Sequence, residues 1–446
     1  MWLINVDTRR LHWHAGETLP RYAILSHTWG DDEVTFQDMH HQIDRSIHDK
    51  AGYRKIDFTC NRAEADGLYW AWVDTCCIDK SSSAELSEAI NSMFRWYHNA
   101  RVCYAYLADF IHNPTADELT FRGHDSFSTS RWFTRGWTLQ ELIAPGFLKF
   151  YDCAFNFICS RGQIVSQLVS ITGIPGELMA RDRADPDRLN ETYRSLARCS
   201  IAQRMSWASR RRCTREEDRA YSLFGIFSVN LPMLYGEGRG AFTRLQEEIL
   251  RTSTDHSIFA WRYTSDTVQP HCERYLLAPS PQGFFSGSSV ATKPSFTHAA
   301  RPYDMTNLGL RMTVFLAEET SDRSYPGKKA LSMALDCIDP LDGSDGPPKR
   351  YFLTLFQVDE TADVYHLDRY AAPLYAAKRT LDDYKQDTIF VLRDFGQSWE
   401  LTSEVKNVDS AVEGLNGSGD STHTETDTPM HARSERSPEG AKRRRL

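Results

Sequence analysis

The stretch RYAILSHTWGDDEVTF, residues 21–36, decides how the N-terminal part of this chain is interpreted. It begins with the apolar run Tyr22 to Leu25, which is typical of a buried strand. Polar and aromatic side chains follow at once, first Ser26, His27 and Trp29 and then three acidic residues. Because ligands bind beyond the carboxyl ends of parallel strands, this pattern predicts a strand whose exit loop lines a cleft.

Length and composition fit a soluble globular protein. The chain has 446 residues, enough for two or three domains, and 41% of them are hydrophobic. Its net charge of -8 argues against a general affinity for nucleic acid. We find no signal peptide and no apolar run that could span a bilayer, so we expect a cytoplasmic protein with no membrane partner. The ten cysteines include no C-x-x-C pair and are expected to be reduced and mostly buried.

Strands and helices alternate between residues 22 and 152. Apolar runs predict strands at 22–25, 69–73, 102–107 and 147–151. Helical periodicity predicts one helix over 53–66 and another after Ser82, whose spacing to Glu85 is that of a capping box. This alternation predicts an α/β fold with a parallel sheet, right-handed crossovers and flanking helices.

The rest of the chain divides by composition. Residues 153–261 lose the strand signals and predict a helical extension. Residues 262–406 hold short β-rich runs between Pro, Gly and Asp, which predict a smaller β-rich C-terminal domain. Residues 407–446 have few apolar side chains, so we expect disorder. That tail ends in a basic tetrad, either a nuclear import signal or a solvated charged end: Lys442, Arg443, Arg444 and Arg445.

Four motifs carry a family resemblance over residues 1–261. They are SHTWG at 26–30, WVDTCCIDK at 72–80, RGWTLQEL at 135–142 and EDRAYSLFGI at 217–226. In this order they resemble the fungal heterokaryon-incompatibility (HET) domain. The resemblance implies a role in non-self recognition and regulated cell death. It implies no prosthetic cofactor, and either self-assembly or a receptor protein as a partner.

A more distant resemblance concerns residues 22–152. The stretches YAILSHTWGDDEVTF and SRWFTRGWTLQELIAPGFLKFYD resemble Toll/interleukin-1 receptor (TIR) domains, in which a tryptophan precedes a Glu-Leu pair. The insertion at residues 111–130 departs from a compact TIR domain. The likeness implies a TIR/flavodoxin-like sheet with NAD as the candidate substrate. It also implies that Glu141 is the catalytic residue that breaks the nicotinamide–ribose bond.

One carboxylate suits that reaction, because nicotinamide leaves as a neutral group and needs no general acid, unlike the leaving group of most glycosidases. Glu141 would stabilise the positive ribose of the transition state. The segments 26–30 and 74–79 are expected at the same sheet edge. Asp74 or Asp79 would hold a ribose hydroxyl, Trp29 would stack on a base, and Arg135 would meet a phosphate. The full set of candidate binding residues is Ser26, His27, Trp29, Asp74, Asp79, Arg135 and Trp137.

Each of these residues also has a structural alternative. Large aromatic side chains such as Trp29 and Trp137 more often serve packing than ligand stacking. A lone histidine more often caps a turn or bonds a carbonyl than binds a ligand. Asp74 and Asp79 are placed to cap the helix that follows them. Arg135 and Glu141 could belong to a structural ion-pair network.

Three further functions stay open from the sequence. The first is a non-catalytic interaction module that triggers cell death by assembling with a receptor or with another copy of itself. The second is a cysteine hydrolase that would use Cys76 or Cys77 with His27. The third is a metal site at His27, Asp31 and Asp32, which is weaker, because such residues are common on acidic surface loops.

Overall fold

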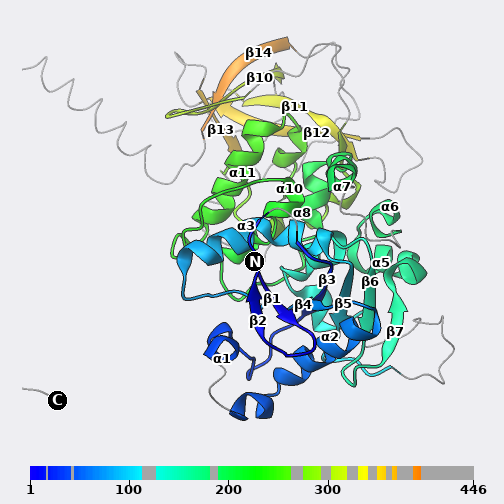
Figure 1. The fold of residues 1–446 in the computed structure, drawn as a ribbon. Coiled ribbons are helices and arrows are strands. Elements are labelled where there is room, and N and C mark those ends of the chain that lie inside the picture. Colours follow the sequence, from blue (N-terminus) through cyan, green and yellow to red (C-terminus); the bar gives the residue numbers. More distant parts are fainter. Residues whose placement is uncertain are drawn as a thin grey trace, which may run out of the picture. The chain divides into compact units, whose positions relative to one another are not determined.

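A mixed sheet of seven strands forms the centre of the N-terminal part (Figure 1). The computed structural model describes residues 1–16, 19–41, 45–112, 127–180, 189–262, 275–292, 303–318, 330–339, 349–357, 364–368 and 385–392. Across the sheet the strands lie in the order β2-β1-β4-β3-β5-β6-β7. Their bounds are β1 Trp2–Asn5, β2 Leu11–Trp13, β3 Tyr22–His27, β4 Trp70–Trp72, β5 Val102–Tyr106, β6 Leu148–Tyr151 and β7 Phe157–Ser160.

The four predicted strands are confirmed, and they are parallel to one another at the centre of the sheet. β3 pairs in parallel with both β4 and β5, and β5 pairs in parallel with β6. The parallel sheet predicted for residues 22–152 is therefore present, and β1, β2 and β7, which lie outside that range, extend it by antiparallel pairing at the two edges. These edge strands have only three or four residues each, too few to give a readable alternation of side chains.

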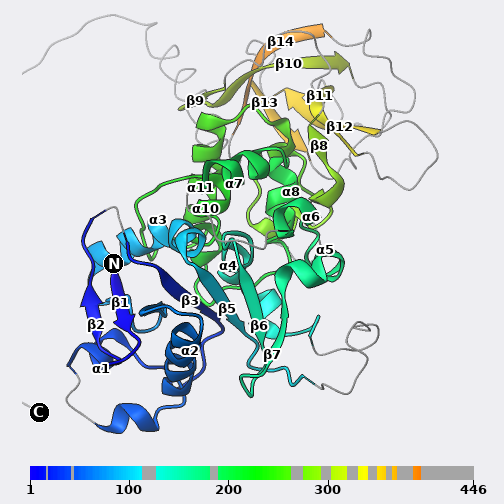
Figure 2. The ribbon, with the colours of Figure 1, turned by 45° about the vertical axis from the view of Figure 1, so that its right-hand side comes forward.

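Helices cover both faces of this sheet. α2 lies on one face, and α3 and α4 lie on the other (Figures 1 and 2). The Ser82 side chain caps α3 by accepting from the Glu85 backbone at 3.3 Å, as the capping spacing predicted. The helical segments are α1 Phe36–His41, η1 Arg45–Asp49, α2 Tyr53–Ala65, α3 Ser83–Asn99, η2 Arg131–Thr134 and α4 Thr138–Ile143.

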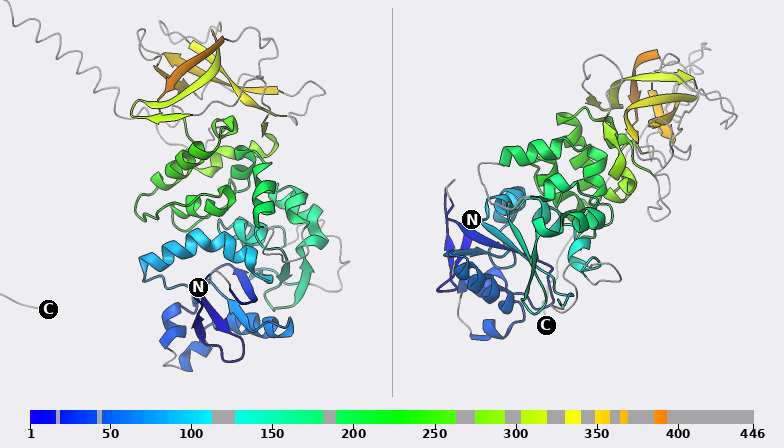
Figure 3. Two further views of the ribbon diagram at one scale, coloured as in Figure 1. Left: turned by 45° about the horizontal axis from the view of Figure 1, so that its top comes forward. Right: turned by 90° about the vertical axis from the view of Figure 1, so that its right-hand side faces the viewer.

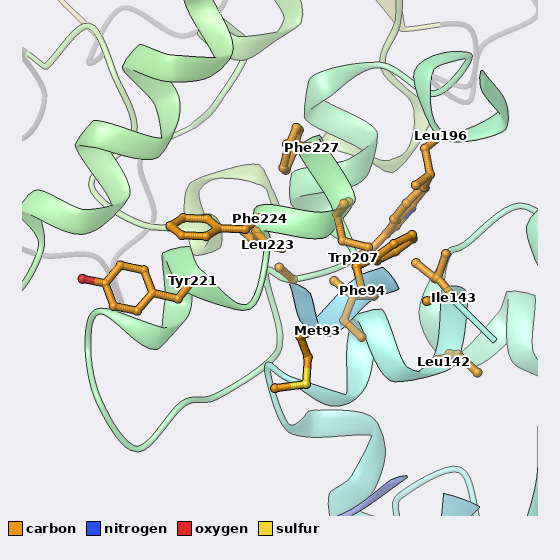
Figure 4. Packing of buried hydrophobic residues seen from close by; sticks show 14 of the residues in the cluster. Met93, Phe94, Leu142, Ile143, Leu196, Trp207, Tyr221, Leu223, Phe224 and Phe227 are labelled. Carbon is orange, nitrogen blue, oxygen red and sulfur yellow. The ribbon is translucent and has the colours of Figure 1, made fainter. Parts of the chain in front are cut away.

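Helices follow β7 within the predicted extension, and they form a layer that packs against α3. Figure 4 shows Met93 and Phe94 of α3 among its buried side chains. α10 approaches α3 so closely that a Cβ on Gly225 would lie 2.2 Å from the Phe94 Cβ. The segments are η3 Arg161–Ile164, α5 Val165–Thr172, α6 Gly176–Met179, α7 Leu189–Ala197, α8 Ile201–Ser206, α9 Asp218–Tyr221, α10 Phe224–Phe227, α11 Gly240–Thr252 and η5 His256–Phe259.

The C-terminal half of the chain contains a second seven-stranded sheet, drawn in yellow to orange in Figure 3. Its order is β8-β11-β12-β13-β14-β10-β9, and the four β-rich runs of the sequence form β10, β11, β12 and β14. The predicted domain boundary at 261 stays a prediction, and the tail at 407–446 lies outside the described residues. The segments are η8 Pro281–Phe284, η9 Gly287–Ser289, β8 Ala291–Thr292, β9 Asp304–Thr306, β10 Gly309–Glu318, β11 Ala330–Asp339, β12 Lys349–Gln357, β13 Val364–Asp368 and β14 Lys385–Val391.

None of the helices in the described ranges combines the length and the apolar character that a membrane crossing requires.

Candidate functional site

The carboxyl end of β3 meets α4 at a buried hydrogen-bond network. The Ser26 hydroxyl donates to Oε2 of Glu141 at 2.5 Å, and the Trp132 indole donates to the same hydroxyl oxygen at 2.8 Å. The Tyr97 hydroxyl bonds the Glu141 carboxyl as well, while donating its own proton to the Leu25 carbonyl at 2.9 Å. Sequence reasoning therefore placed Ser26 and Glu141 at one site correctly.

Glu141 is enclosed within this network. All six residues of α4 are buried, and Glu141 is 7% exposed. Burial, followed by the nearby charge of Asp74, raises the pKa of Glu141 to about 8. The hydrogen bonds of Ser26 and Tyr97 to the carboxyl act in the opposite direction and lower this pKa, but burial outweighs them. The arrangement therefore favours a neutral carboxylic acid at pH 7.

His27 points to the other face of the sheet, since neighbouring strand residues alternate. Its Nε2 lies 3.8 Å from Oε2 of Glu33, and its Nδ1 lies 3.8 Å from Oδ1 of Asp74. Neither ring nitrogen hydrogen-bonds to any residue that the structure describes, although the side chain is only 1% exposed. Burial, with a further effect from Lys55, lowers the pKa of His27 to about 3. The imidazole is therefore neutral, and neither turn capping nor a carbonyl bond accounts for it.

Asp74, which follows β4, lies near residues on both faces of the sheet. Its charge raises the pKa of Glu141, and its Oδ1 is the atom 3.8 Å from the His27 ring. Its Oδ2 accepts from the Trp29 indole at 2.8 Å. The Lys80 ammonium lies 3.6 Å from the centre of the Trp29 ring. Trp29 is 48% exposed, so it is not a core residue and presents an aromatic surface beside the site.

Asp79 has the structural role that its position allows. Its carboxylate accepts from the Ser81 backbone and hydroxyl and from the Gln37 amide. These hydrogen bonds, that of the Ser81 hydroxyl first, lower the pKa of Asp79. Ser82, one residue further on, is the N-cap of α3. Asp79 thus shapes the turn before α3 at the rim of the site.

Arg135 and Trp137 make their side-chain contacts outside the network of Ser26 and Glu141, and their binding roles stay predictions. The Arg135 guanidinium donates to the Thr214 hydroxyl at 3.2 Å, and Trp137 hydrogen-bonds Asp218. The physical reason is that both residues precede α4 in a turn that bridges to residue 212.

The cysteine and metal alternatives find little support in the geometry. Burial raises the pKa of the Cys76 thiol well above its ordinary value, which disfavours the thiolate that a nucleophile needs. Asp32 accepts from the Ala51 backbone at 2.9 Å instead of facing His27. Within the described ranges, no three His, Cys, Asp or Glu residues come together as a metal ion would require.

Comparison with known proteins places this geometry in a family. Residues 22–120 match the family described as "Heterokaryon incompatibility protein (HET)", and residues 240–318 match a domain of unknown function, DUF8212. Residues 22–120 are thus similar to HET domains. Vegetative incompatibility protein HET-E-1 of Podospora anserina is 47% identical over 238 residues, 52% of this chain. The chain spans only 16% of the length of that relative. No solved structure matches this chain significantly.

The structure places further residues at the site that sequence reasoning missed. Trp132 and Tyr97 complete the buried network, and Lys55, Lys80 and Glu33 surround His27 and Trp29. Tyr97 lies on the apolar stripe of α3, where a tyrosine cannot be told from a core residue by pattern. Trp132 could have been predicted as a site residue, because the N–H of a buried indole needs a hydrogen-bond acceptor, and the Ser26 hydroxyl is that acceptor.

Proposed function

We propose that this chain acts in heterokaryon incompatibility as an effector of regulated cell death. The match to a vegetative incompatibility protein at 47% identity over 238 residues supports this role. The HET domain supplies the part that is shared, and its candidate site lies where α/β proteins of this topology bind ligands. Ser26 is the next-to-last residue of β3, which borders the point where the strand order reverses, between β3 and β5.

We propose further that the site cleaves the nicotinamide–ribose bond of NAD. The carbon–nitrogen bond breaks with its electron pair leaving on neutral nicotinamide, and water adds to the ribose carbon and releases a proton. Glu141 in its ionised form would stabilise the positive charge that develops on the ribose. Asp74 would accept from a ribose hydroxyl, and the exposed ring of Trp29 would stack on a base. The single observation that carries this proposal is the Glu141 carboxyl, held by Ser26 at the sheet switch point.

The raised pKa of Glu141 makes the proposed chemistry dependent on pH. Since the pKa is about 8, only a minor fraction of the carboxyl is ionised at pH 7. If the ionised form is the active one, NAD cleavage should increase about tenfold between pH 6 and 7 and level off above pH 8. A reaction that does not depend on Glu141 has no reason to follow this profile.

The test is incubation of the purified full chain with NAD between pH 6 and 9, with nicotinamide and ADP-ribose measured by chromatography. Glu141→Gln should lower turnover about a hundredfold to a thousandfold with little change in KM. Glu216→Gln is the matched control, because Glu216 is 40% exposed and pairs with Arg239 on the surface. Cleavage that survives in folded Glu141→Gln contradicts the proposal.

A second function is favoured by the burial of Glu141. A neutral, fully bonded carboxyl at 7% exposure is also what a structural network in an interaction module would show. The chain would then trigger cell death by assembling with a receptor or with another copy. Toxicity on expression separates the two functions, because the interaction module stays toxic as folded Glu141→Gln and the enzyme does not.

A further inference from the structure

A groove of about 540 Å³ opens between α2 and the turn that joins β6 to β7. The groove is lined by residues of α2 and of the β6–β7 segment: Arg54, Asp57, Phe58, Asn61, Arg62 and Ala65, and Tyr151, Phe155 and Phe157. We name these nine residues the α2 groove. None of them takes part in the hydrogen bonds of Ser26 or Glu141. The volume lies in the range that small-molecule ligands occupy in proteins.

One wall of the α2 groove is aromatic. Phe58 stacks on Phe155 with ring centres 4.7 Å apart, and it meets Tyr151 edge to face at 4.9 Å. Phe157 contacts Tyr151 at 5.8 Å and remains 49% exposed. Because the Phe157 ring of this aromatic cluster is exposed, it offers a flat apolar surface on which another ring can stack.

The α2 groove also contains two arginines. The Arg54 guanidinium lies 5.9 Å from the Phe155 ring centre and pairs with no carboxylate among the described residues. Nε of Arg62 is buried and has no hydrogen-bond partner in the described part of the chain. Asp57 lines the groove and pairs with Arg9, while Asp66 pairs with Lys149 and with Nη2 of Arg62, the latter at 3.3 Å. The donors that remain for an anion are therefore the Arg54 guanidinium and Nε of Arg62.

Unusual backbone conformations border the same groove. Phe155 has a φ of 65°, and Arg9, which bonds Asp57 and Asn61 on α2, has a φ of 57°. Residues with side chains rarely adopt this left-handed region, and such strain concentrates at ligand sites. Here the strain places the Phe155 ring on the groove wall and Arg9 against its acidic member.

We infer that the α2 groove binds a small anion that carries a flat aromatic ring, the chemistry of a nucleoside monophosphate. The ring stacks on the surface formed by Phe155 and Phe157. The phosphate accepts from the Arg54 guanidinium and from Nε of Arg62, which matches the planar geometry of arginine donors. This site goes beyond the proposed function, since it shares no residue with the Glu141 site.

Isothermal titration of the full chain with adenosine 5′-monophosphate at low salt tests the inference. We expect saturable binding, and we expect Arg54→Gln and Phe157→Ser each to weaken it at least tenfold. Matched controls are Arg251→Gln and Phe285→Ser, at residues 68% and 47% exposed, which should bind like the wild type. Circular dichroism establishes that each variant is folded.

Three results would overturn the inference. The first is a wild-type chain that shows no saturable binding of adenosine 5′-monophosphate. The second is that adenosine or inorganic phosphate binds as tightly as the nucleotide, which would mean that the groove does not recognise the ring and the phosphate together. The third is binding that persists in Arg54→Gln but is lost in Trp29→Ser, which would assign the nucleotide to the Glu141 site.

Discussion

Replacing Glu141 with Gln should remove a large part of the pH dependence of stability. The carboxyl has a pKa of about 8 in the folded protein and an ordinary value of 4.5 in the unfolded chain. Between these values the folded state holds a proton that the unfolded state has released, so stability falls as pH rises from about 4.5 to about 8. With about 1.4 kcal/mol for each pH unit, the full span is on the order of 5 kcal/mol.

Glutamine preserves the contacts while removing the titration. Its amide oxygen can accept from the Ser26 hydroxyl, and its NH₂ can donate to the Tyr97 oxygen. The variant should therefore fold and should be more stable than the wild type at pH 8. His27 titrates in the opposite sense, because its pKa is lowered to about 3 and its contribution is lost as pH falls below about 6.5. Both proteins share His27, so its effect cancels in the difference.

Urea unfolding of the full chain at pH 5, 6, 7 and 8, followed by circular dichroism, measures this difference. The free energy of unfolding of Glu141→Gln relative to the wild type should rise by several kcal/mol across the series. Glu216→Gln, on the surface, should give a difference that stays flat. Parallel curves for Glu141→Gln and the wild type would refute the reasoning and would mean that Glu141 is ionised when folded.

Two further substitutions test the packing that positions the site. Ser82→Ala removes the N-cap bond to Glu85 at the start of α3 and should cost about 1 kcal/mol in urea unfolding; an unchanged midpoint would contradict the capping role. Gly225→Ala forces a Cβ to within 2.2 Å of the Phe94 Cβ and should cost about 1–3 kcal/mol. Gly240→Ala, whose new Cβ would meet its nearest atom at 3.7 Å, should cost nothing, and equal effects of the two substitutions would disprove the close approach.

Sequence patterns predicted the parts of the fold that have a period. β3, α2 and α3 follow from apolar runs and helical stripes, because each buries one continuous set of side chains. The β1–β2 hairpin has no such period over its short strands. It is held by pairings such as Trp2 with Trp13, which only the folded chain creates.

The sequence indicated where the candidate site lies, but it did not indicate that the Glu141 carboxyl is buried. Ser26 and Glu141 were expected at one sheet edge because parallel strands end there. Their contact joins residues 115 apart in sequence, and the partners Tyr97 and Trp132 come from two further segments. Whether a carboxyl is open or enclosed depends on all of these segments together, so the pattern around Glu141 could not indicate its burial.

The close approach of α10 to α3 bears on how HET domains move between genes during evolution. The matched family region ends at residue 120, yet the apolar side of α3 that includes Phe94 is covered by residues near 225. A recombination event that transferred residues 22–120 alone would leave this side exposed in its new host protein. The smallest heritable module that keeps α3 covered therefore runs through α10. The 238 residues shared with the Podospora protein are long enough to be such a module.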